Sequence, residues 1–258
     1  MTGMTLAQAW PTLFTPQDAQ LLSGKQDLVV PFRPREQILR SGKVADRLLF
    51  ISRGFVGNYR VDRFGRRQFL AIQVPGDFVD LPGFLLGHRD MDAEALGPVE
   101  LCALPPEHLQ SLEAEAPAVD RKLWRISMID AASGWHWIFR LGRLGGRARV
   151  ASFFCDMLVR LYARGLCTFD GFDLPLTQTD LAEVSGMTPV HVSRILSELR
   201  EEGICAFAQG AVQILNLPAL FQTGQYRWDH LYLGDDLDRE IADKAGMRAT
   251  PKRTHVAL

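Results

Sequence analysis

The stretch from residue 176 to 204 has the residue types and spacing of two short helices joined by a tight turn. Thr177 can cap the first helix, because its hydroxyl can accept a hydrogen bond from a backbone N–H of the first turn. Gly186 can end that helix in a left-handed conformation, and Thr188 followed by Pro189 is typical of the start of a second helix. The pattern therefore predicts a helix-turn-helix.

The second of these helices is predicted to expose the end that could contact DNA. Its apolar residues repeat at helical spacing and should face inward, which leaves its N-terminal end exposed. In a helix-turn-helix that end meets base edges in the major groove, and helix starts contact phosphates. The candidate DNA-contacting residues are Thr177, Gln178, Thr188, Pro189, Val190, His191, Ser193 and Arg194. The alternative is an ordinary helical hairpin inside a globular core, and we favour DNA reading because both caps and the glycine turn fall in register.

The composition is that of a folded, soluble protein. Of the 258 residues, 47% are hydrophobic and 23% are charged, which allows a sizeable core and favours two domains over one. No run approaches the roughly 18 apolar residues of a membrane span, and no signal peptide is recognisable, so a cytoplasmic protein without a membrane partner is expected. The four scattered cysteines lack metal-ligand spacing, which favours buried thiols, and no metal or cofactor is expected.

The charge distribution bears on DNA binding more than the net charge of −1 does. Basic residues outnumber acids between Arg121 and Arg164, whereas the helix pair itself is acidic. Phosphate contacts would therefore have to come from Arg194, from backbone N–H groups at helix starts and from neighbouring arginines.

Helical and strand patterns alternate along the chain. Residues 1–24 predict one or two short amphipathic helices, and residues 27–104 predict an antiparallel barrel or roll. The predicted strands of this roll are 28–30, 37–39, 48–51, 55–61, 68–72 and 99–104. After the helix pair, 204–207 and 211–215 predict the two-stranded wing of a winged helix, and a charged tail follows.

Between the roll and the helix pair, the sequence predicts a long helix with a dimer seam. Apolar and small residues alternate steps of four and three, as in a heptad repeat. They are Trp124, Met128, Ala131, Trp135, Ile138 and Gly142. The helix could instead pack only on its own roll, but a homodimer is favoured because symmetric operators need two-fold proteins. With Gly145-Gly146 as a hinge, the predicted divisions are 1–112 for N-terminal helices and roll, 113–144 for the dimerisation helix, 145–221 for the DNA-binding domain and 222–258 for the tail.

In this order of parts, the chain from about Asp27 to Leu220 resembles the Crp/Fnr family of bacterial transcription regulators. The most specific matches are 176–204 and the roll segment from Ser52-Arg53-Gly54 through Pro75-Gly76-Asp77-Phe78. The resemblance implies an α+β fold with an N-terminal antiparallel β-roll like a cyclic-nucleotide-binding domain, a long dimerisation helix and a C-terminal winged helix-turn-helix. It also implies double-stranded DNA with a palindromic operator as partner, and RNA polymerase as a further candidate partner.

The resemblance assigns roles to two residues of the second helix. Arg194 falls at the recognition-helix arginine that family members use on a guanine, which suits a guanidinium that can donate to O6 and N7. Val190 stands where many members have a glutamate. The operator is therefore expected to differ from the family's best-known palindromes.

The roll departs from the family's cyclic-nucleotide site. Asp80 stands where the ribose-binding glutamate would fall, and Arg89 near the phosphate-binding Arg-Ser is followed by Asp90, which would repel a phosphate. Cyclic AMP binding in the usual mode is therefore not expected. The candidate effector-pocket residues are Gly76, Asp77, Asp80, Leu81, Arg89 and Asp90. The N-terminal cysteine cluster of the iron–sulfur members is absent, whereas haem ligation through His88, His136 or Met91 stays open.

These patterns favour one function over two others. The leading hypothesis is a homodimeric, sequence-specific transcription regulator that senses an unidentified effector or none. The alternative is a cyclic-nucleotide sensor that acts chiefly through protein partners, for which Asp80 and Arg89 are the support. An enzyme is not expected, because the sequence has no nucleophile elbow, phosphate loop or metal-ligand spacing.

Overall fold

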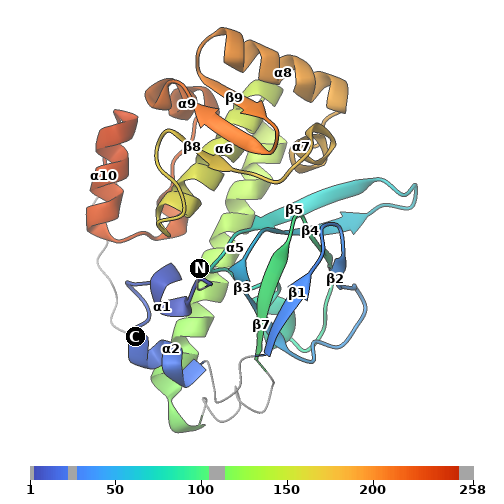
Figure 1. The fold of residues 1–258 in the computed structure, drawn as a ribbon, viewed down its shortest axis with the longest axis vertical. Coiled ribbons are helices and arrows are strands. Elements are labelled where there is room, and N and C mark those ends of the chain that lie inside the picture. The colour runs from blue at the N-terminus through green and yellow to red at the C-terminus, as the bar shows by residue number, and fades with distance from the viewer. Residues whose placement is uncertain (1–2, 23–27, 105–113, 250–258) are drawn as a thin grey trace.

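The computed structural model describes residues 3–22, 28–104 and 114–249. Figure 1 shows the long helix α5 (Pro117–Arg143) along the longest axis of the molecule, with a β-roll beside its lower part and the helix-rich C-terminal part beside its upper part. The predicted α+β fold is confirmed. Three predictions lie outside the described residues. They are the division between 112 and 113, the start of the roll at residue 27 and the end of the tail at 250–258.

The β-roll consists of two antiparallel sheets. One has the order β1 (Leu28–Phe32), β7 (Val99–Leu104), β3 (Leu48–Arg53). The other has the order β2 (Gln37–Leu39), β6 (Asp92–Ala95), β4 (Val56–Val61), β5 (Arg67–Gln73). Apolar side chains from both sheets, among them Ile51, Val56 and Leu101, form a buried cluster. Three short helices accompany the roll: α1 (Leu6–Ala9), α2 (Pro16–Leu22) and α3 (Leu81–Leu85).

The C-terminal part is a winged helix-turn-helix built on α6 (Gly146–Tyr162). After α6 come β8 (Gly171–Asp173), α7 (Gln178–Ser185), α8 (Pro189–Glu201), β9 (Cys205–Ala208) and β10 (Ala211–Ile214). The three strands form one antiparallel sheet in the order β8-β10-β9. The predicted wing is thus present, with β8 as a third strand that the sequence analysis did not predict.

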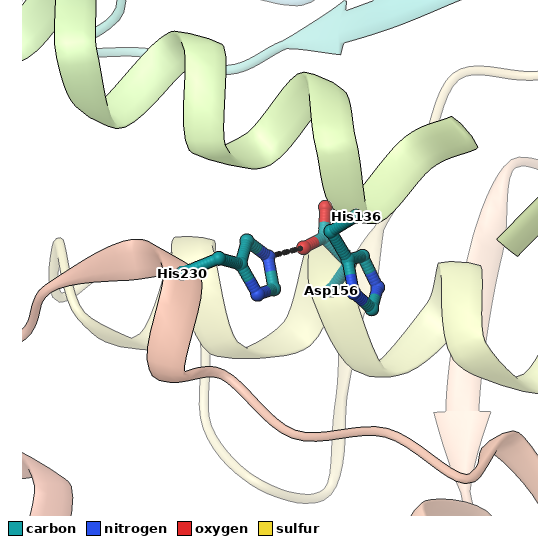
Figure 2. A group of neighbouring side chains, drawn as sticks. All are labelled: His136, Asp156 and His230. Carbon is teal, nitrogen blue, oxygen red and sulfur yellow. Dashed lines mark hydrogen bonds and ion pairs between the residues drawn. The ribbon is translucent and has the colours of Figure 1, made fainter. Parts of the chain in front are cut away.

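The segment after the wing folds back onto the molecule. It contains α9 (Leu217–Gly224), the short 3-10 helix η1 (Asp229–Leu231) and α10 (Asp235–Ala245). Tyr226 donates a hydrogen bond from its hydroxyl to Asp156 at 2.9 Å. His230 of η1 lies 3.2 Å from the same carboxylate, as Figure 2 shows. The predicted tail therefore docks on α6, at least as far as the described residues extend.

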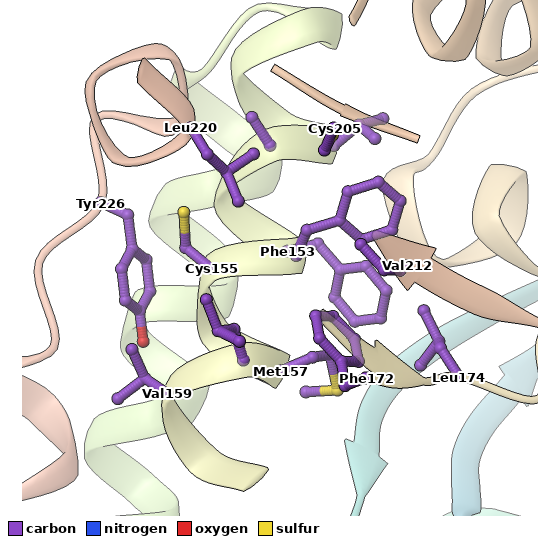
Figure 3. Packing of buried hydrophobic residues seen from close by; sticks show 14 of the residues in the cluster. Phe153, Cys155, Met157, Val159, Phe172, Leu174, Cys205, Val212, Leu220 and Tyr226 are labelled. Atoms are coloured by element: carbon purple, nitrogen blue, oxygen red, sulfur yellow. The ribbon is translucent and has the colours of Figure 1, made fainter. Parts of the chain in front are cut away.

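Helix α6 is the centre of the main hydrophobic core. Every residue from Val150 to Val159 is buried. Figure 3 shows residues of α6, such as Phe153 and Met157, packed among side chains from the wing sheet, α9 and the docked tail. The cluster also includes Phe69 and Ile72 of β5, so the core of the C-terminal part continues into the roll.

Among the described residues, no helix combines the length and the apolar character that crossing a membrane requires.

Candidate DNA interface

The helix pair is fixed by the local hydrogen bonds that its sequence suggests. The Thr177 hydroxyl accepts from the backbone N–H of Asp180 at 3.1 Å, and the Asp180 carboxylate accepts from the backbone N–H of Thr177 at 2.7 Å. Gly186 ends α7 with φ 61° and ψ 41°, the left-handed conformation that glycine adopts without strain. Thr188 caps α8 by accepting from the backbone N–H of His191 at 3.3 Å. Both helix starts therefore follow directly from the sequence.

Helix α8 has a buried face and an exposed N-terminal end. Val192, Ile195, Leu196 and Leu199 are buried in the domain core. All eight candidate DNA-contacting residues are exposed, and Val190 has 72% of its surface accessible. They come from two places: Thr177 and Gln178 lie at the start of α7, and the others lie in the first turns of α8 and its cap. The fold thus presents the N-terminal end of α8 to solvent.

Two arginines near the helix pair, Arg147 and Arg149, already have partners inside the protein. Arg147 forms a bidentate ion pair with Glu202. Arg149 donates to the backbone carbonyls of Ser185 at 2.6 Å and Leu144 at 3.0 Å, and so ties α6 to α7. Arg194, by contrast, is exposed and forms no ion pair with any described residue. It is therefore available to a partner outside the chain.

An ion-pair network joins α7 to the roll. Arg35 donates two hydrogen bonds to Asp180, at 2.9 and 2.5 Å. Arg67 of β5 reaches Glu183 at 2.5 Å and Asp180 at 3.1 Å, and both arginines also bind Glu94. Burial by itself raises the pKa of Asp180, but the hydrogen bonds from Arg35 and Thr177 outweigh it and hold that pKa below its usual range. The carboxylate that caps α7 therefore also anchors it to the roll.

Replacing Arg67 by alanine should lower the free energy of unfolding by about 1–3 kcal/mol, because three carboxylates lose a charged hydrogen-bond donor at a half-buried site. Urea unfolding at neutral pH would measure this change, and hydrogen exchange should rise in α7. Arg66→Ala is the matched control, since this neighbouring side chain is exposed and, among the described residues, contacts only the turn beside it, through an ion pair with Asp62 and the ring of Phe64. Equal stability of the two variants would show that the network does not hold α7.

The predicted seam residues form an exposed stripe on α5. The opposite face of the helix packs on the protein through Val119, Leu123, Ile126 and Ile129. Trp135 and Ile138 are 71% and 69% exposed, and Trp124 and Met128 are also exposed. Ala131 and Gly142 complete the stripe and are exposed as well. Within the single chain the helix packs through its opposite face, so the stripe is free for a second copy, and the alternative of a helix that packs only on its own roll stays open.

The residues assigned to an effector pocket lie at different places: Arg89 lines one pocket, whereas Asp77 lines a cavity between the roll, α5 and α6. Its carboxylate is buried and forms ion pairs with Arg160 and Arg164 of the segment around the end of α6. Gly76 has φ 96°, and its carbonyl accepts from the indole N–H of Trp10 at 2.7 Å. Both residues therefore join the roll to α6 and to the N-terminal helices.

The other four pocket candidates are also engaged within the roll or against α5. Asp80 caps α3 by accepting from the backbone N–H of Gly83 at 3.0 Å. Leu81 is fully buried in a cluster with residues of α5. Arg89 pairs with Asp46 at 3.2 Å, and Asp90 pairs with Arg60 at 3.3 Å. A nucleotide phosphate would have to compete with Asp46 for the Arg89 side chain.

Comparison with known proteins agrees with this architecture. Residues 29–115 match the family model described as cyclic nucleotide-binding domain, and residues 148–223 match the Crp-like helix-turn-helix domain. The fold and the exposed helix pair define a DNA-binding transcription regulator. The two models together span more than half of the chain, which belongs to the Crp/Fnr family.

Individual relatives are similar over most of their length. The anaerobic regulatory protein of Pasteurella multocida is 24% identical over 192 residues, which are 74% of this chain and 70% of that protein. The fumarate and nitrate reduction regulatory protein of Escherichia coli K12 is 24% identical over 74% of this chain and 76% of its own. The structure of FixK2 from Bradyrhizobium japonicum superposes with a TM-score of 0.70 at 25% identity, covering 79% of this chain and all of that one.

Proposed function

We propose that this protein is a homodimer that regulates transcription by reading a palindromic double-stranded operator with the N-terminal end of α8. The observation that carries the proposal is the exposed Arg194, which has no ion pair within the described part of the chain and lies beside a capped helix start in a Crp-like helix-turn-helix domain. In this proposal residues 145–221 form the DNA-binding domain and 113–144 the dimerisation helix.

Each exposed residue of the helix pair has a role that its chemistry allows. Arg194 donates two hydrogen bonds to O6 and N7 of a guanine, and Val190 meets a thymine methyl group. Ser193 and His191 contact neighbouring base edges. Thr177, Gln178, Thr188 and the helix N-termini bind phosphates, which sets the register without reading sequence.

The exposed stripe on α5 supports the homodimer. Four large apolar side chains in one row on a helix expose more hydrophobic surface than isolated surface residues do, and such patches usually mark an interface. A second copy packed on the same stripe would bury the tryptophans and relate the two α8 helices by a two-fold axis, as a palindrome requires.

For the roll, we infer that cyclic nucleotide does not bind in the mode of the nucleotide-sensing relatives. The ion pair of Arg89 with Asp46 and the capping role of Asp80 support this inference. Calorimetry with cyclic AMP and cyclic GMP at millimolar concentration should give no binding heat, and saturable heat would instead favour the cyclic-nucleotide sensor.

The proposal can be tested by selecting genomic DNA fragments with the purified protein, with and without cyclic AMP. We expect enrichment of one palindromic motif in both conditions. Fragments retained without any shared motif at low salt would contradict a sequence-specific regulator, and enrichment only with cyclic AMP would contradict the inference about the roll.

Replacing Arg194 by alanine should weaken binding to the selected operator by about 1–3 kcal/mol and relax one base position in each half-site. Competition binding against single-base variants of the operator would measure both effects. Arg200→Ala is the matched control, because Arg200 is also exposed on α8 but lies at its C-terminal end. An unchanged base preference in the Arg194 variant would show that Arg194 does not contact a base.

A further inference from the structure

A cavity of about 140 Å³ lies where several parts of the molecule meet, and we name it the junction cavity. Its walls come from α5, from α6 and the turn after it, from β5 of the roll, from the segment that contains η1, and from residues 9–12 at the end of α1 and after it. Figure 2 shows one side of this region, where His136 of α5, Asp156 of α6 and His230 of η1 converge. The junction cavity is separate from Arg89 and Asp80, which do not line it.

Arg140 lines the junction cavity and is the most unusual side chain in it. The residue is 1% exposed, yet Nε, Nη1 and Nη2 have no hydrogen-bond partner, and no ion pair joins it to a described residue. Its guanidinium lies 3.9 Å from the centre of the Trp137 ring and 5.2 Å from that of Phe153. Burial lowers its pKa to about 10, so the side chain remains charged at neutral pH. Asp156 acts on Arg140 as a nearby negative charge but forms no ion pair with it, and a buried cation without an ion pair or hydrogen bonds costs several kcal/mol.

Other unpartnered nitrogen atoms line the same cavity. Trp137 Nε1, Arg164 Nη1 and His136 Nε2 are buried without a hydrogen-bond partner. Six of the twelve such atoms in the described part of the chain therefore belong to four residues of one cavity, which is not the scatter expected of isolated packing defects. Arginine and tryptophan side chains can only donate, so this set of atoms matches a ligand that supplies acceptors.

The acids near Arg140 are already engaged. Asp156 accepts from Tyr226, lies against His230 and is 3.5 Å from Arg160, and these contacts outweigh burial and hold its pKa below the usual range. Asp77 pairs with Arg160 and Arg164. Burial raises the pKa of Asp130, another lining residue, to about 7, so this carboxyl is only partly ionised at neutral pH. None of these three carboxyl groups forms an ion pair or a hydrogen bond with Arg140.

The same neighbourhood disfavours a metal ion. The potential ligand atoms of His136, Asp156 and His230 lie within 4.8 Å of one another, which resembles a three-ligand site. However, Arg140 acts on His136 and Arg160 acts on Asp156 as nearby positive charges, and a divalent cation would be repelled by both. The charge around the junction cavity suits an anion.

The rest of the lining indicates what kind of anion. Leu70, Ile72, Ile129, Leu231 and Leu237 contribute apolar surface. An engineered cavity of similar volume, about 150 Å³, holds one benzene molecule, so there is room for a small ring or a short alkyl chain. We propose that the junction cavity binds a small organic carboxylate, whose oxygens accept hydrogen bonds from Arg140 and Trp137 while its apolar body packs against these side chains.

The junction cavity adds the chemical class of the effector to the proposed function. Its role in regulation rests on that proposed function. A carboxylate bound there contacts the roll, the dimerisation helix, α6 and the docked tail at once. It favours the arrangement of these four parts that the structure describes, because it binds that arrangement more tightly than any in which the walls separate.

The test is direct binding to the full chain at pH 7, measured by calorimetry and by thermal unfolding. The carboxylate probes are acetate, butyrate and benzoate, and benzyl alcohol is the neutral counterpart of benzoate. Inorganic phosphate and Zn²⁺ test the two alternatives, an inorganic anion and a metal ion. We expect at least one carboxylate to bind and to raise the unfolding midpoint, and benzyl alcohol to have little effect. Binding by phosphate alone, binding by Zn²⁺ alone, or no response to any carboxylate would overturn the proposal.

Three variants locate the site. Arg140→Met keeps a long side chain but removes the charge, and it should weaken carboxylate binding by about 10- to 100-fold without lowering the midpoint of the unliganded protein. Arg143→Met, at an exposed position of the same helix, should leave binding unchanged. Trp137→Phe, which keeps an aromatic side chain but removes the indole N–H donor, provides a second measurement if the Arg140 variant does not fold. Equal binding by all three variants and the parent protein would place the ligand elsewhere.

These measurements do not involve DNA. Carboxylate binding without any operator would refute the proposed function and leave the site standing. Operator binding by a protein that ignores every carboxylate would refute the site alone.

Discussion

Replacing Asp77 by asparagine is expected to lower the free energy of unfolding by about 3–5 kcal/mol at neutral pH. The carboxylate is buried, forms ion pairs with Arg160 and Arg164, and also accepts from the backbone N–H of Val74 at 2.9 Å. Asparagine keeps the shape of the side chain but leaves these arginines without that negative charge. Urea unfolding would measure the loss, and Asp236→Asn, at an exposed acid of α10 that pairs with Arg239, should leave the unfolding midpoint nearly unchanged.

The pH dependence of this difference identifies its cause. Burial alone raises the pKa of Asp77, but the charges of Arg164 and Arg160 outweigh it and hold that pKa below the usual range of an aspartate. A carboxyl whose pKa is lower in the folded state contributes stability above its unfolded pKa and loses it as the pH falls through the folded pKa. The difference between parent and variant should therefore be constant from pH 8 to 5 and narrow below about pH 4. A difference that does not narrow in acid would point to altered packing instead of lost charge.

The parts of the fold that depend on neighbouring residues could be predicted from the sequence. Thr177, Gly186, Thr188 and Pro189 act on groups within a few positions of themselves, and the predicted caps and turn are present. Six strands of the roll were predicted for the same reason, since alternating apolar residues and turn glycines are local signals. The strand β6 was missed because its sequence, Asp-Ala-Glu-Ala, has no β-branched or aromatic residue.

The direction in which a side chain points could not be predicted where the partner is remote in sequence. Asp77 was assigned to an effector pocket by its neighbours along the chain, whereas its partners Arg160 and Arg164 lie more than 80 positions away. Arg35 and Arg67 were not singled out at all, although they hold α7 through Asp180 across 145 and 113 positions. Local spacing gives no signal for such pairs, because the tertiary fold alone decides which charges meet.

Helix α5 combines both cases. Its heptad spacing predicted the stripe that the structure leaves exposed, because an apolar row is a property of one helix. The residues of the junction cavity, Trp137 and Arg140, lie on another face of the same helix and carry no sequence pattern of their own. Only the packing of α6, β5 and η1 around that face makes Arg140 a buried cation.

Replacing Trp135 by glutamate is expected to convert the proposed dimer to monomer without unfolding the protomer. The side chain is 71% exposed in the single chain, so the substitution removes little packing within it. In a two-fold seam each protomer would lose about 2–3 kcal/mol of buried tryptophan surface, and two carboxylates would face each other in an apolar contact. A loss of about 4 kcal/mol corresponds to a dissociation constant roughly 1,000-fold higher, and the charge increases it further.

Sedimentation velocity over a range of concentrations would measure this change, and circular dichroism would verify the fold. Phe64→Glu is the matched control, since Phe64 is 66% exposed at the turn between β4 and β5 and lies outside the stripe. The Trp135 variant should also lose most of its affinity for a palindrome while keeping the weaker affinity of one protomer for a single half-site, because linked half-sites gain from effective concentration. A Trp135 variant that stays dimeric would show that the stripe is not the dimer interface. A monomeric variant with unchanged affinity for the palindrome would show that the two half-sites are not read by one dimer.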